Sequence, residues 1–267
     1  MNRIWVLMSF TPQEHADFIK EFGAYLAELN LPTRMLLGDN SDATTFDFIL
    51  PALNNSETHK YIGAVSFHSW RGCDDVTLRK WADAAKEINV PLLVGEGSTD
   101  AAAHGYAEIF NESTFALYEI NLYTRICTIC QPLSILQWQL TSDYSLLWGD
   151  GIYGSKGPLR PTQRFWNIKQ LASTPADALA IPVSSSKKNV NCAAFGNMVR
   201  GEYAVHMVNN GADCEAVISG IPAEVKKLKV YVTNTKDCMK ETAVKVENGL
   251  VRVHLPAISF ITLLSGE

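Results

Sequence analysis

The hydrophobic pattern of this chain changes its period once, near Ser173-Thr174-Pro175. Before this point, apolar residues recur every three or four positions in segments that alternate with short apolar runs, as in helices alternating with buried strands. From Val190 onward, short segments alternate apolar and polar residues between turn signals such as Asn209-Asn210-Gly211, as in antiparallel strands. The sequence therefore predicts two domains, an α/β domain over residues 1–172 and a β-sandwich over residues 173–267.

The α/β domain is predicted to be a series of strand and helix units. A capping box, Thr11-Pro12-Gln13-Glu14, begins a helix that runs from Pro12 to about Leu29. The short apolar run from Ile4 to Met8 is a candidate strand ahead of it. The buried face of the helix is expected to carry Phe18, Phe22, Tyr25, Leu26 and Leu29. Further strands are expected over Thr33 to Gly38, Tyr61 to His68, Pro91 to Ser98 and Leu133 to Gln139, and helices over Thr45 to Leu53, Asp75 to Ile88, Thr114 to Cys130 and Thr162 to Leu171.

Four consecutive strand and helix units, from Thr33 to Ala172, are half of a (β/α)8 barrel of the TIM type. We therefore predict an α/β plus all-β fold, in which an incomplete half barrel precedes an antiparallel β-sandwich. The sandwich should pack against the last barrel helix and bury Phe165 and Trp166. The predicted sandwich strands are Asn191 to Phe195, Glu202 to Val208, Cys214 to Ile218, Lys229 to Thr233, Thr242 to Val246, Leu250 to Leu255 and Ile258 to Leu264.

A half barrel that stays open exposes two strand edges and one apolar face. A second copy that completes the missing half would cover these edges and this face. We therefore expect a homo-oligomer, either a dimer or a higher even assembly.

The composition argues against two classes of partner. The formal net charge is −5, the pI is about 5.7 and the chain has no long run of Lys or Arg, so we expect no nucleic acid partner. No apolar run approaches the roughly 18 residues that a membrane span needs, so we expect a soluble protein with no membrane segment. The run from Ile4 to Met8 is too short for the apolar core of a signal peptide. The sequence gives no indication of the cellular location.

The six cysteines are scattered, and a chain of 267 residues does not need disulfides to be stable. Cys127 and Cys130 have the C-x-x-C spacing, but they lie in a helical pattern, and no second pair stands at zinc-finger spacing. We therefore expect free thiols, no metal site and no cofactor.

Polar and aromatic residues stand at the ends of the predicted strands of the α/β domain. Glu96 lies between Gly95 and Gly97 at the end of one strand, and these glycines would let a substrate approach the carboxylate closely. In parallel α/β folds, the carboxyl ends of strands are where ligands bind. An acid that caps the next helix would give the same local sequence. The residues at the other strand ends must therefore distinguish a ligand-binding carboxylate from a helix cap.

The other strand ends favour a sugar site. They carry Asp39, His68 with Trp70, and Trp138 with Gln139. Sugars pack their C–H faces on indole rings, and their hydroxyl groups pair with carboxylates, amides and imidazoles. Each residue also has a structural alternative, because the two indoles could lie in the core and His68 could be a strand-end histidine with satisfied hydrogen bonds.

The order of these motifs resembles the C-terminal half of a clan A glycoside hydrolase, most like family 30. The resemblance covers nearly the whole chain through short motifs, and it includes a C-terminal β-sandwich reached through a helix like Pro161 to Leu171. The matching stretches are Phe10 to Lys20 with the helix after strand four, Arg34 to Asp39 with strand five, Ala64 to Trp70 with strand six, Leu92 to Gly97 with strand seven and Ile135 to Gln139 with strand eight.

The resemblance implies retaining hydrolysis of a β-glycosidic bond. In the clan, the glutamate that ends strand seven is the catalytic nucleophile, which corresponds to Glu96 here, and the tryptophan of strand eight lines a sugar subsite, which corresponds to Trp138. His68, Trp70, Gln139 and Asp39 are then expected to bind the carbohydrate substrate.

One departure from the family bears on activity. In the clan, the acid/base glutamate follows an asparagine at the end of strand four, and strands one to three or four have no counterpart here. The single Asn-Glu pair, Asn111-Glu112, follows strand seven. Retaining hydrolysis needs a nucleophile and a proton donor about 5–5.5 Å apart. For the catalytic interpretation, Asp39, Asp143 or an acid of another subunit would have to supply the proton donor. A second interpretation is therefore a non-catalytic carbohydrate-binding or assembly half barrel. A phosphate-binding half barrel is a third alternative, disfavoured because no Gly-rich phosphate loop is visible.

Overall fold

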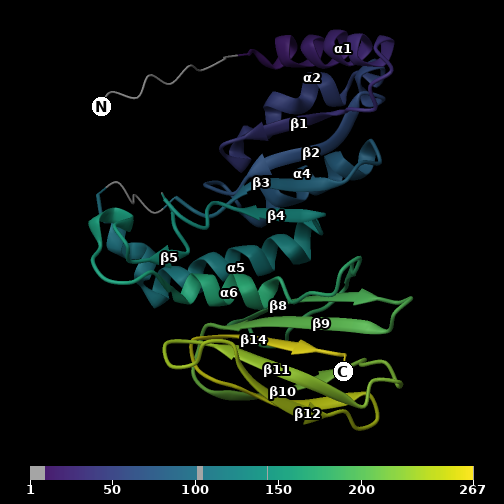
Figure 1. The fold of residues 1–267 in the computed structure, drawn as a ribbon. Helices are drawn as coiled ribbons and strands as arrows, with labels where there is room; N and C mark the ends of the chain where they lie inside the picture. Colours follow the sequence, from purple (N-terminus) through teal and green to yellow (C-terminus); the bar gives the residue numbers. More distant parts are fainter. Residues whose placement is uncertain (1–9, 101–104, 143, 267) are drawn as a thin grey trace. The chain divides into compact units, whose positions relative to one another are not determined.

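The computed structural model describes residues 10–100, 105–142 and 144–266, which form two compact units (Figure 1). The first unit comprises Met1–Gly97 and Pro132–Leu136, and the second comprises Ser98–Gln131 and Gln137–Glu267. The candidate strand from Ile4 to Met8 lies outside the described residues. The sequence predicted a domain limit near Ser173, and this limit stays a prediction. The second compact unit also contains two helices that precede Ser173 in the chain.

The first unit is built on a sheet with the strand order β1-β2-β3-β4. β1 and β2 are parallel, as are β2 and β3, and Leu37 pairs with Val65 while Phe67 pairs with Val94. The predicted alternation of strands and helices is confirmed, but the sheet is not closed, so the incomplete barrel stays a prediction. The strands are β1 (Met35–Asn40), β2 (Ile62–His68), β3 (Leu92–Gly97) and β4 (Ser134–Gln137), and the helices are α1 (Pro12–Glu28), η1 (Ala43–Ile49), α2 (Leu50–Leu53), α3 (Ser56–His59) and α4 (Asp75–Glu87).

Helix α1 begins with the predicted capping box but buries a different face. Thr11 Oγ1 accepts a hydrogen bond from the backbone N–H of Glu14 at 3.2 Å, and the Glu14 carboxylate accepts one from the backbone N–H of Thr11 at 2.7 Å. The residues buried on α1 are Ala16, Ile19, Gly23 and Leu26. The prediction was therefore wrong for the four large residues that remain exposed, Phe18, Phe22, Tyr25 and Leu29.

Small residues determine which face of α1 is buried, because they allow neighbouring elements to approach closely. A Cβ on Gly23 would lie 2.4 Å from the Tyr61 ring, so the buried face of α1 has no room for a side chain at this position. The large side chains are turned outward.

The second unit combines two α-helices with antiparallel sheets. A six-stranded sheet has the order β12-β11-β14-β9-β8-β7, and the pair β10-β13 shares one apolar core with it, which includes Leu228, Val251 and Ile261. The seven predicted strands are confirmed, and β7 was not predicted. The elements are η2 (Ala107–Asn111), α5 (Ser113–Cys130), β5 (Leu147–Trp148), η3 (Ile152–Gly154), β6 (Arg160–Pro161), α6 (Gln163–Leu171), β7 (Leu179–Ile181), β8 (Val190–Asn197), β9 (Glu202–Asn209), β10 (Cys214–Ser219), β11 (Lys227–Thr233), β12 (Lys240–Lys245), β13 (Leu250–Leu255) and β14 (Ser259–Leu264).

Helix α6 buries polar residues where aromatic ones were expected. Phe165 and Trp166 are only half-buried, so their predicted burial was wrong. Arg164, Asn167 and Gln170 are buried instead. Gln170 Nε2 donates hydrogen bonds to Thr262 Oγ1 at 3.0 Å and to the Phe260 carbonyl at 3.1 Å, so the helix is joined to the sheet by amide contacts. Buried polar groups of this kind are stable because their hydrogen bonds are satisfied.

The two cysteines with C-x-x-C spacing lie buried on α5. Burial raises the pKa of the Cys127 thiol to about 12, so this thiol stays protonated at neutral pH. Metal binding and thiol exchange both require the thiolate. The pair is therefore part of the core packing of α5.

His206 makes the stability of the second unit dependent on pH. The ring is fully buried on β9, its two nitrogens lie 2.8 Å from the hydroxyl oxygens of Thr174 and Thr262, and burial lowers its pKa from 6.5 to about 3. Because the folded pKa is depressed, the unfolded chain binds the proton more readily, and stability is lost as the pH falls below 6.5. Between pH 7 and pH 5 we expect the loss from this one group to be about 2 kcal/mol.

Urea unfolding of the wild type and of His206→Gln at pH 7 and pH 5 measures this contribution. The variant lacks the titrating ring, so its free energy of unfolding should fall less over this interval. Equal pH slopes in the two proteins would contradict the assignment.

Candidate functional site

Three predicted site residues come together at the carboxyl ends of adjacent strands. Asp39 lies near the end of β1, His68 ends β2, and Glu96 is the penultimate residue of β3. His68 and Glu96 are paired across the sheet. The parallel strands therefore bring these side chains to one edge of the first unit, as the sequence predicted.

His68 lies between the two carboxylates. Its Nε2 is 3.4 Å from Asp39 Oδ1, and its Nδ1 is 3.2 Å from Glu96 Oε2. The second contact is close, but its atoms are not aligned for a hydrogen bond. The His68 side chain is only 13% exposed, against 27% for Glu96 and 42% for Asp39. A ligand would therefore meet the two carboxylates before the imidazole.

Trp70 also contacts Glu96. Its indole Nε1–H donates a hydrogen bond to Glu96 Oε2 at 3.0 Å. The donor fixes the orientation of the carboxylate. Stacking of a sugar on Trp70 stays a prediction, but the structure assigns the indole a second task, which is to hold Glu96 in place.

Asp39 is held as an anion. His68, and to a lesser extent the Ser66 hydroxyl, which donates to Asp39 Oδ1 at 2.7 Å, lower the pKa of Asp39 against the opposing effect of burial. A general acid in glycoside hydrolysis needs a raised pKa. Asp39 is therefore suited to binding hydroxyl groups and not to donating the proton that the leaving group requires.

Gly95 makes room for Asp39. A Cβ at position 95 would lie 2.1 Å from Asp39 Oδ1 and 3.0 Å from Ser66 Oγ. The sequence interpretation gave this glycine the task of admitting substrate to Glu96. The contact seen here is with a neighbouring side chain of the same site.

We expect Gly95→Ala to lower the free energy of unfolding by about 1–3 kcal/mol, because the added methyl group overpacks the space that Asp39 occupies. Urea unfolding of Gly95→Ala, Asp39→Ala and the double variant measures the coupling between the two positions. The glycine substitution should cost less in the Asp39→Ala background. Additive effects would contradict the assignment.

Trp138 and Gln139 follow β4 and belong to the second unit. Trp138 is 39% exposed, and the peptide bond between the two residues is cis. The Gln139 carbonyl accepts a hydrogen bond from the Leu146 N–H at 3.1 Å. Their sugar-binding role stays a prediction. Asp143, a candidate proton donor, lies outside the described residues.

A buried ion pair in the second unit was not predicted. Arg164 on α6 donates from Nε to Glu119 Oε2 at 2.9 Å and from Nη2 to Glu119 Oε1 at 2.7 Å. Glu119 Oε1 also accepts from the Ser98 hydroxyl at 2.8 Å, and Gln137 Nε2 lies 3.4 Å from it. Ser98 stands two residues after Glu96 in the chain, and Gln137 directly precedes Trp138. The sequence signal was the position of Glu119, an acid at helical spacing from the apolar residues Phe115 and Tyr123 of α5.

Searches by sequence find no matching family model and no matching curated protein. The fold, in contrast, matches solved glycoside hydrolases. A GH30 endoxylanase from Clostridium papyrosolvens C71 matches with a TM-score of 0.79 at 14% identity, covering 98% of this chain and 62% of that one. The GH30 subfamily 8 xylanase Xyn30A from Clostridium acetobutylicum gives 0.80 at 15% identity, with the same coverage. AbfB, a family 51 α-L-arabinofuranosidase from Bifidobacterium longum, gives 0.61 at 12% identity, covering 96% of this chain and 64% of that one.

The chain therefore shares its fold with part of these family 30 and family 51 enzymes. At these identities the likeness concerns the fold, and the chain spans about three fifths of the length of the solved structures that it matches. None of the helices over the described ranges has both the length and the apolar composition needed to cross a bilayer. The same ranges contain no group of three or more His, Cys, Asp or Glu residues placed to hold a metal ion.

Proposed function

We propose that this chain is a glycoside hydrolase-like protein that acts on a β-glycosidic bond through Glu96. The observation that carries the proposal is the setting of this carboxylate. It stands at a strand end, it accepts a hydrogen bond from the Trp70 indole, and it is partly exposed. The fold match to xylanases and an arabinofuranosidase supports a carbohydrate as the ligand.

In the proposed reaction, one Glu96 oxygen attacks the anomeric carbon of the sugar. A carbon–oxygen bond to the carboxylate forms as the bond to the leaving group breaks, and the leaving oxygen takes the electron pair. The Trp70 hydrogen bond at Oε2 leaves Oε1 as the attacking atom. Asp39 and His68 would bind sugar hydroxyl groups, Trp70 and Trp138 would pack against the ring, and Gln139 would supply an amide.

A second candidate function is carbohydrate binding or assembly without turnover. The observation that favours it is the lowered pKa of Asp39, the other carboxylate beside His68, because an ionised acid cannot protonate a poor leaving group. The two candidates differ only in whether the covalent step occurs and is completed.

The experiment that tests the proposal uses aryl β-glycosides with strongly acidic phenols, such as dinitrophenol. Such phenolates leave without being protonated, so a nucleophile alone is sufficient for the first step. We expect a burst of phenolate and a glycosyl adduct on the peptide that contains Glu96, detected by mass spectrometry. Aryl α-glycosides are the matched control and should give no adduct.

The result also separates the two candidates. Sugar binding seen as a change in tryptophan fluorescence, with no adduct from any β-glycoside in the panel, would establish the binding function and overturn the catalytic one.

A further inference from the structure

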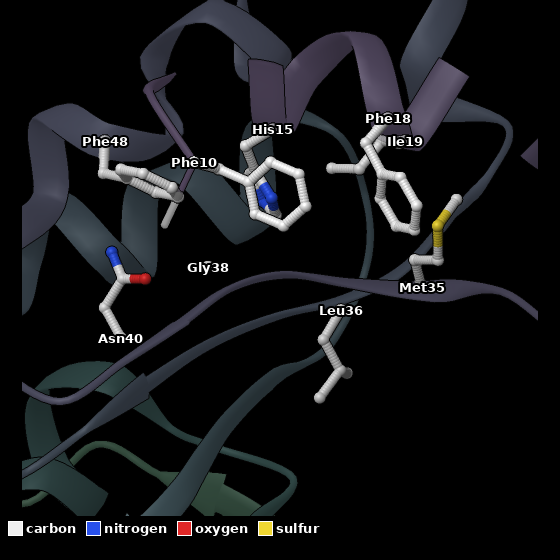
Figure 2. Close-up of a pocket in the computed structure, with 9 residues that line it drawn as sticks. All are labelled: Phe10, His15, Phe18, Ile19, Met35, Leu36, Gly38, Asn40 and Phe48. Atoms are coloured by element: carbon white, nitrogen blue, oxygen red, sulfur yellow. The ribbon is translucent and has the colours of Figure 1, made fainter. Parts of the chain in front are cut away.

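Two features of the molecule lie apart from the strand-end carboxylates. The first is a pocket of about 540 Å³ between α1 and β1 in the first unit (Figure 2). The rings of Phe10, Phe18 and Phe48 line it, and Phe10 is the first of the described residues, so we assign this pocket no occupant. The second is the buried polar cluster around Glu119 and Arg164 in the second unit. Its hydrogen bonds lead to a predicted site residue.

The chain that follows β4 forms a loop and returns beside its own start. The Gln139 N–H donates a hydrogen bond to the Tyr144 carbonyl at 3.4 Å, and the Gln139 carbonyl accepts one from the Leu146 N–H at 3.1 Å. Trp138 and Gln139, two predicted sugar-binding residues, therefore stand at the start of a loop whose return begins at Tyr144. The position of Trp138 depends on what holds the two ends of this loop.

Arg164 holds the return of the loop. Its Nη1 donates hydrogen bonds to the Tyr144 carbonyl at 3.0 Å and to the Ser145 carbonyl at 2.9 Å. The Nε and Nη2 atoms of the same guanidinium group are bound by the Glu119 carboxylate. Because the guanidinium group is planar, this two-point contact also fixes the direction in which Nη1 donates.

Gln137 holds the start of the loop. Its Nε2 donates a hydrogen bond to the Trp138 carbonyl at 3.0 Å and lies 3.4 Å from Glu119 Oε1. Its Oε1 accepts a hydrogen bond from the Tyr123 hydroxyl at 2.6 Å. Tyr123 is buried, and burial raises its pKa well above 10, so the phenol keeps its proton and remains a donor. The amide of Gln137 therefore has one orientation, with Nε2 directed to the Trp138 carbonyl.

We propose that Gln137 is a positioning residue, which fixes the place of the Trp138 indole for packing against a sugar. Trp138 is 39% exposed, so burial of the ring alone does not determine where it lies. Residues that bind a ligand need supporting hydrogen bonds to keep a single position. Tyr123 and Glu119 supply this support through Gln137. The contribution to sugar binding rests on the proposed function, whereas the placement of the indole does not.

A purely structural role explains fewer of these contacts. A pair that only joined α5 to α6 would need the two hydrogen bonds between Arg164 and Glu119. It would not need the Gln137 amide, which reaches the Trp138 backbone and makes no contact with α6 among its hydrogen bonds. Apolar residues of similar volume often replace a buried ion pair without loss of stability. The polar cluster is therefore better explained by what it orients than by the helix contact alone.

Fluorine NMR of the protein labelled with fluorotryptophan tests the placement of Trp138 without any sugar. Trp138→Phe identifies the resonance by its loss. Gln137→Met removes the amide and keeps the length of the side chain. In this variant we expect the Trp138 resonance to broaden or split, because the loop then samples more than one position. The resonance of Trp81, which is fully buried in the first unit, should stay sharp.

Two further variants separate positioning from an effect on the adjacent residue. Tyr123→Phe changes no residue next to Trp138 in the chain, but it removes the donor to Gln137 Oε1, so it should broaden the resonance in the same way. Gln163→Met makes the same substitution at a half-buried glutamine of α6 whose side chain forms no hydrogen bond within the described residues, and it should have no effect. Circular dichroism confirms that each variant is folded. A Trp138 resonance that stays sharp in both Gln137→Met and Tyr123→Phe would overturn the proposal.

Adduct formation with the dinitrophenyl β-glycosides described above provides the second readout. Gln137→Met should raise the glycoside concentration that gives half the maximal rate by about three- to tenfold, the effect of one lost hydrogen bond of ordinary strength. The maximal rate should hardly change, because a packed indole binds the sugar before and during the reaction. If Gln137 acts through Trp138, the double variant Gln137→Met/Trp138→Phe should bind no more weakly than Trp138→Phe alone.

The outcomes of the two readouts are distinct. Additive losses in the double variant would overturn the role of Gln137 in placing Trp138, since Gln137 would then act independently of the indole. No adduct with any glycoside, together with a broadened Trp138 resonance in Gln137→Met and Tyr123→Phe, would count only against the proposed function and would leave the placement of the indole established.

Discussion

Glu96→Gln is expected to reduce aryl β-glycoside hydrolysis by at least about 10³-fold, because an amide cannot form the covalent glycosyl intermediate. Gln has almost the same shape as Glu, and its side-chain oxygen can still accept the hydrogen bond from Trp70 Nε1. The folded structure should therefore be retained, and the melting temperature should change by no more than about 2 °C. Initial rates and thermal unfolding of the same preparations give both quantities.

The matched control is Glu87→Gln, an exposed residue at the end of α4. It removes one negative charge from the same unit and should leave the rate unchanged. A large loss of stability in Glu96→Gln would make Glu96 a structural residue. Unchanged hydrolysis in Glu96→Gln would require a different nucleophile.

The strand-end residues could be predicted because they depend on local sequence. A short apolar run places the next polar residue at the end of a strand, and parallel strands place such ends at one edge. This was enough to predict that Asp39, His68 and Glu96 come together. It could not give the contacts between them, because the hydrogen bond from Trp70 to Glu96 depends on the path that the chain follows after β2 ends at His68.

The faces of α1 and α6 could not be predicted, because periodicity identifies an apolar stripe but not its partner. On α1, Gly23 permits a contact closer than any aromatic residue allows. On α6, Arg164 and Gln170 are buried because distant residues satisfy their hydrogen bonds. The preference for burying large apolar side chains is overridden when such partners exist. Gly95 is a similar case, since the side chain that needs its space lies on another strand.

Arg164→Met is expected to lower the free energy of unfolding by about 3–5 kcal/mol, the cost of leaving a buried charge without its partner. The exposed fractions of the Arg164 and Glu119 side chains are 0% and 2%, so water cannot replace the lost contact. Arg164 also donates to the Tyr144 and Ser145 carbonyls at 3.0 and 2.9 Å, and its guanidinium group lies 4.9 Å from the centre of the Phe110 ring. The substitution therefore removes five hydrogen-bond donors from a region without solvent.

The same measurement on two further variants isolates the contribution of charge. Glu119→Gln leaves the Arg164 charge buried and should also be strongly destabilising, whereas the double variant Arg164→Met/Glu119→Leu removes both charges and should cost less than the sum of the single changes. Arg79→Met is the matched control, because Arg79 pairs with Asp75 at 3.6 Å on the surface of α4, where such a pair contributes about 0–1 kcal/mol. Urea unfolding of the five proteins gives the comparison. If Arg164→Met cost no more than Arg79→Met, the pair would not join α5 to α6, and the polar face of α6 would need another explanation.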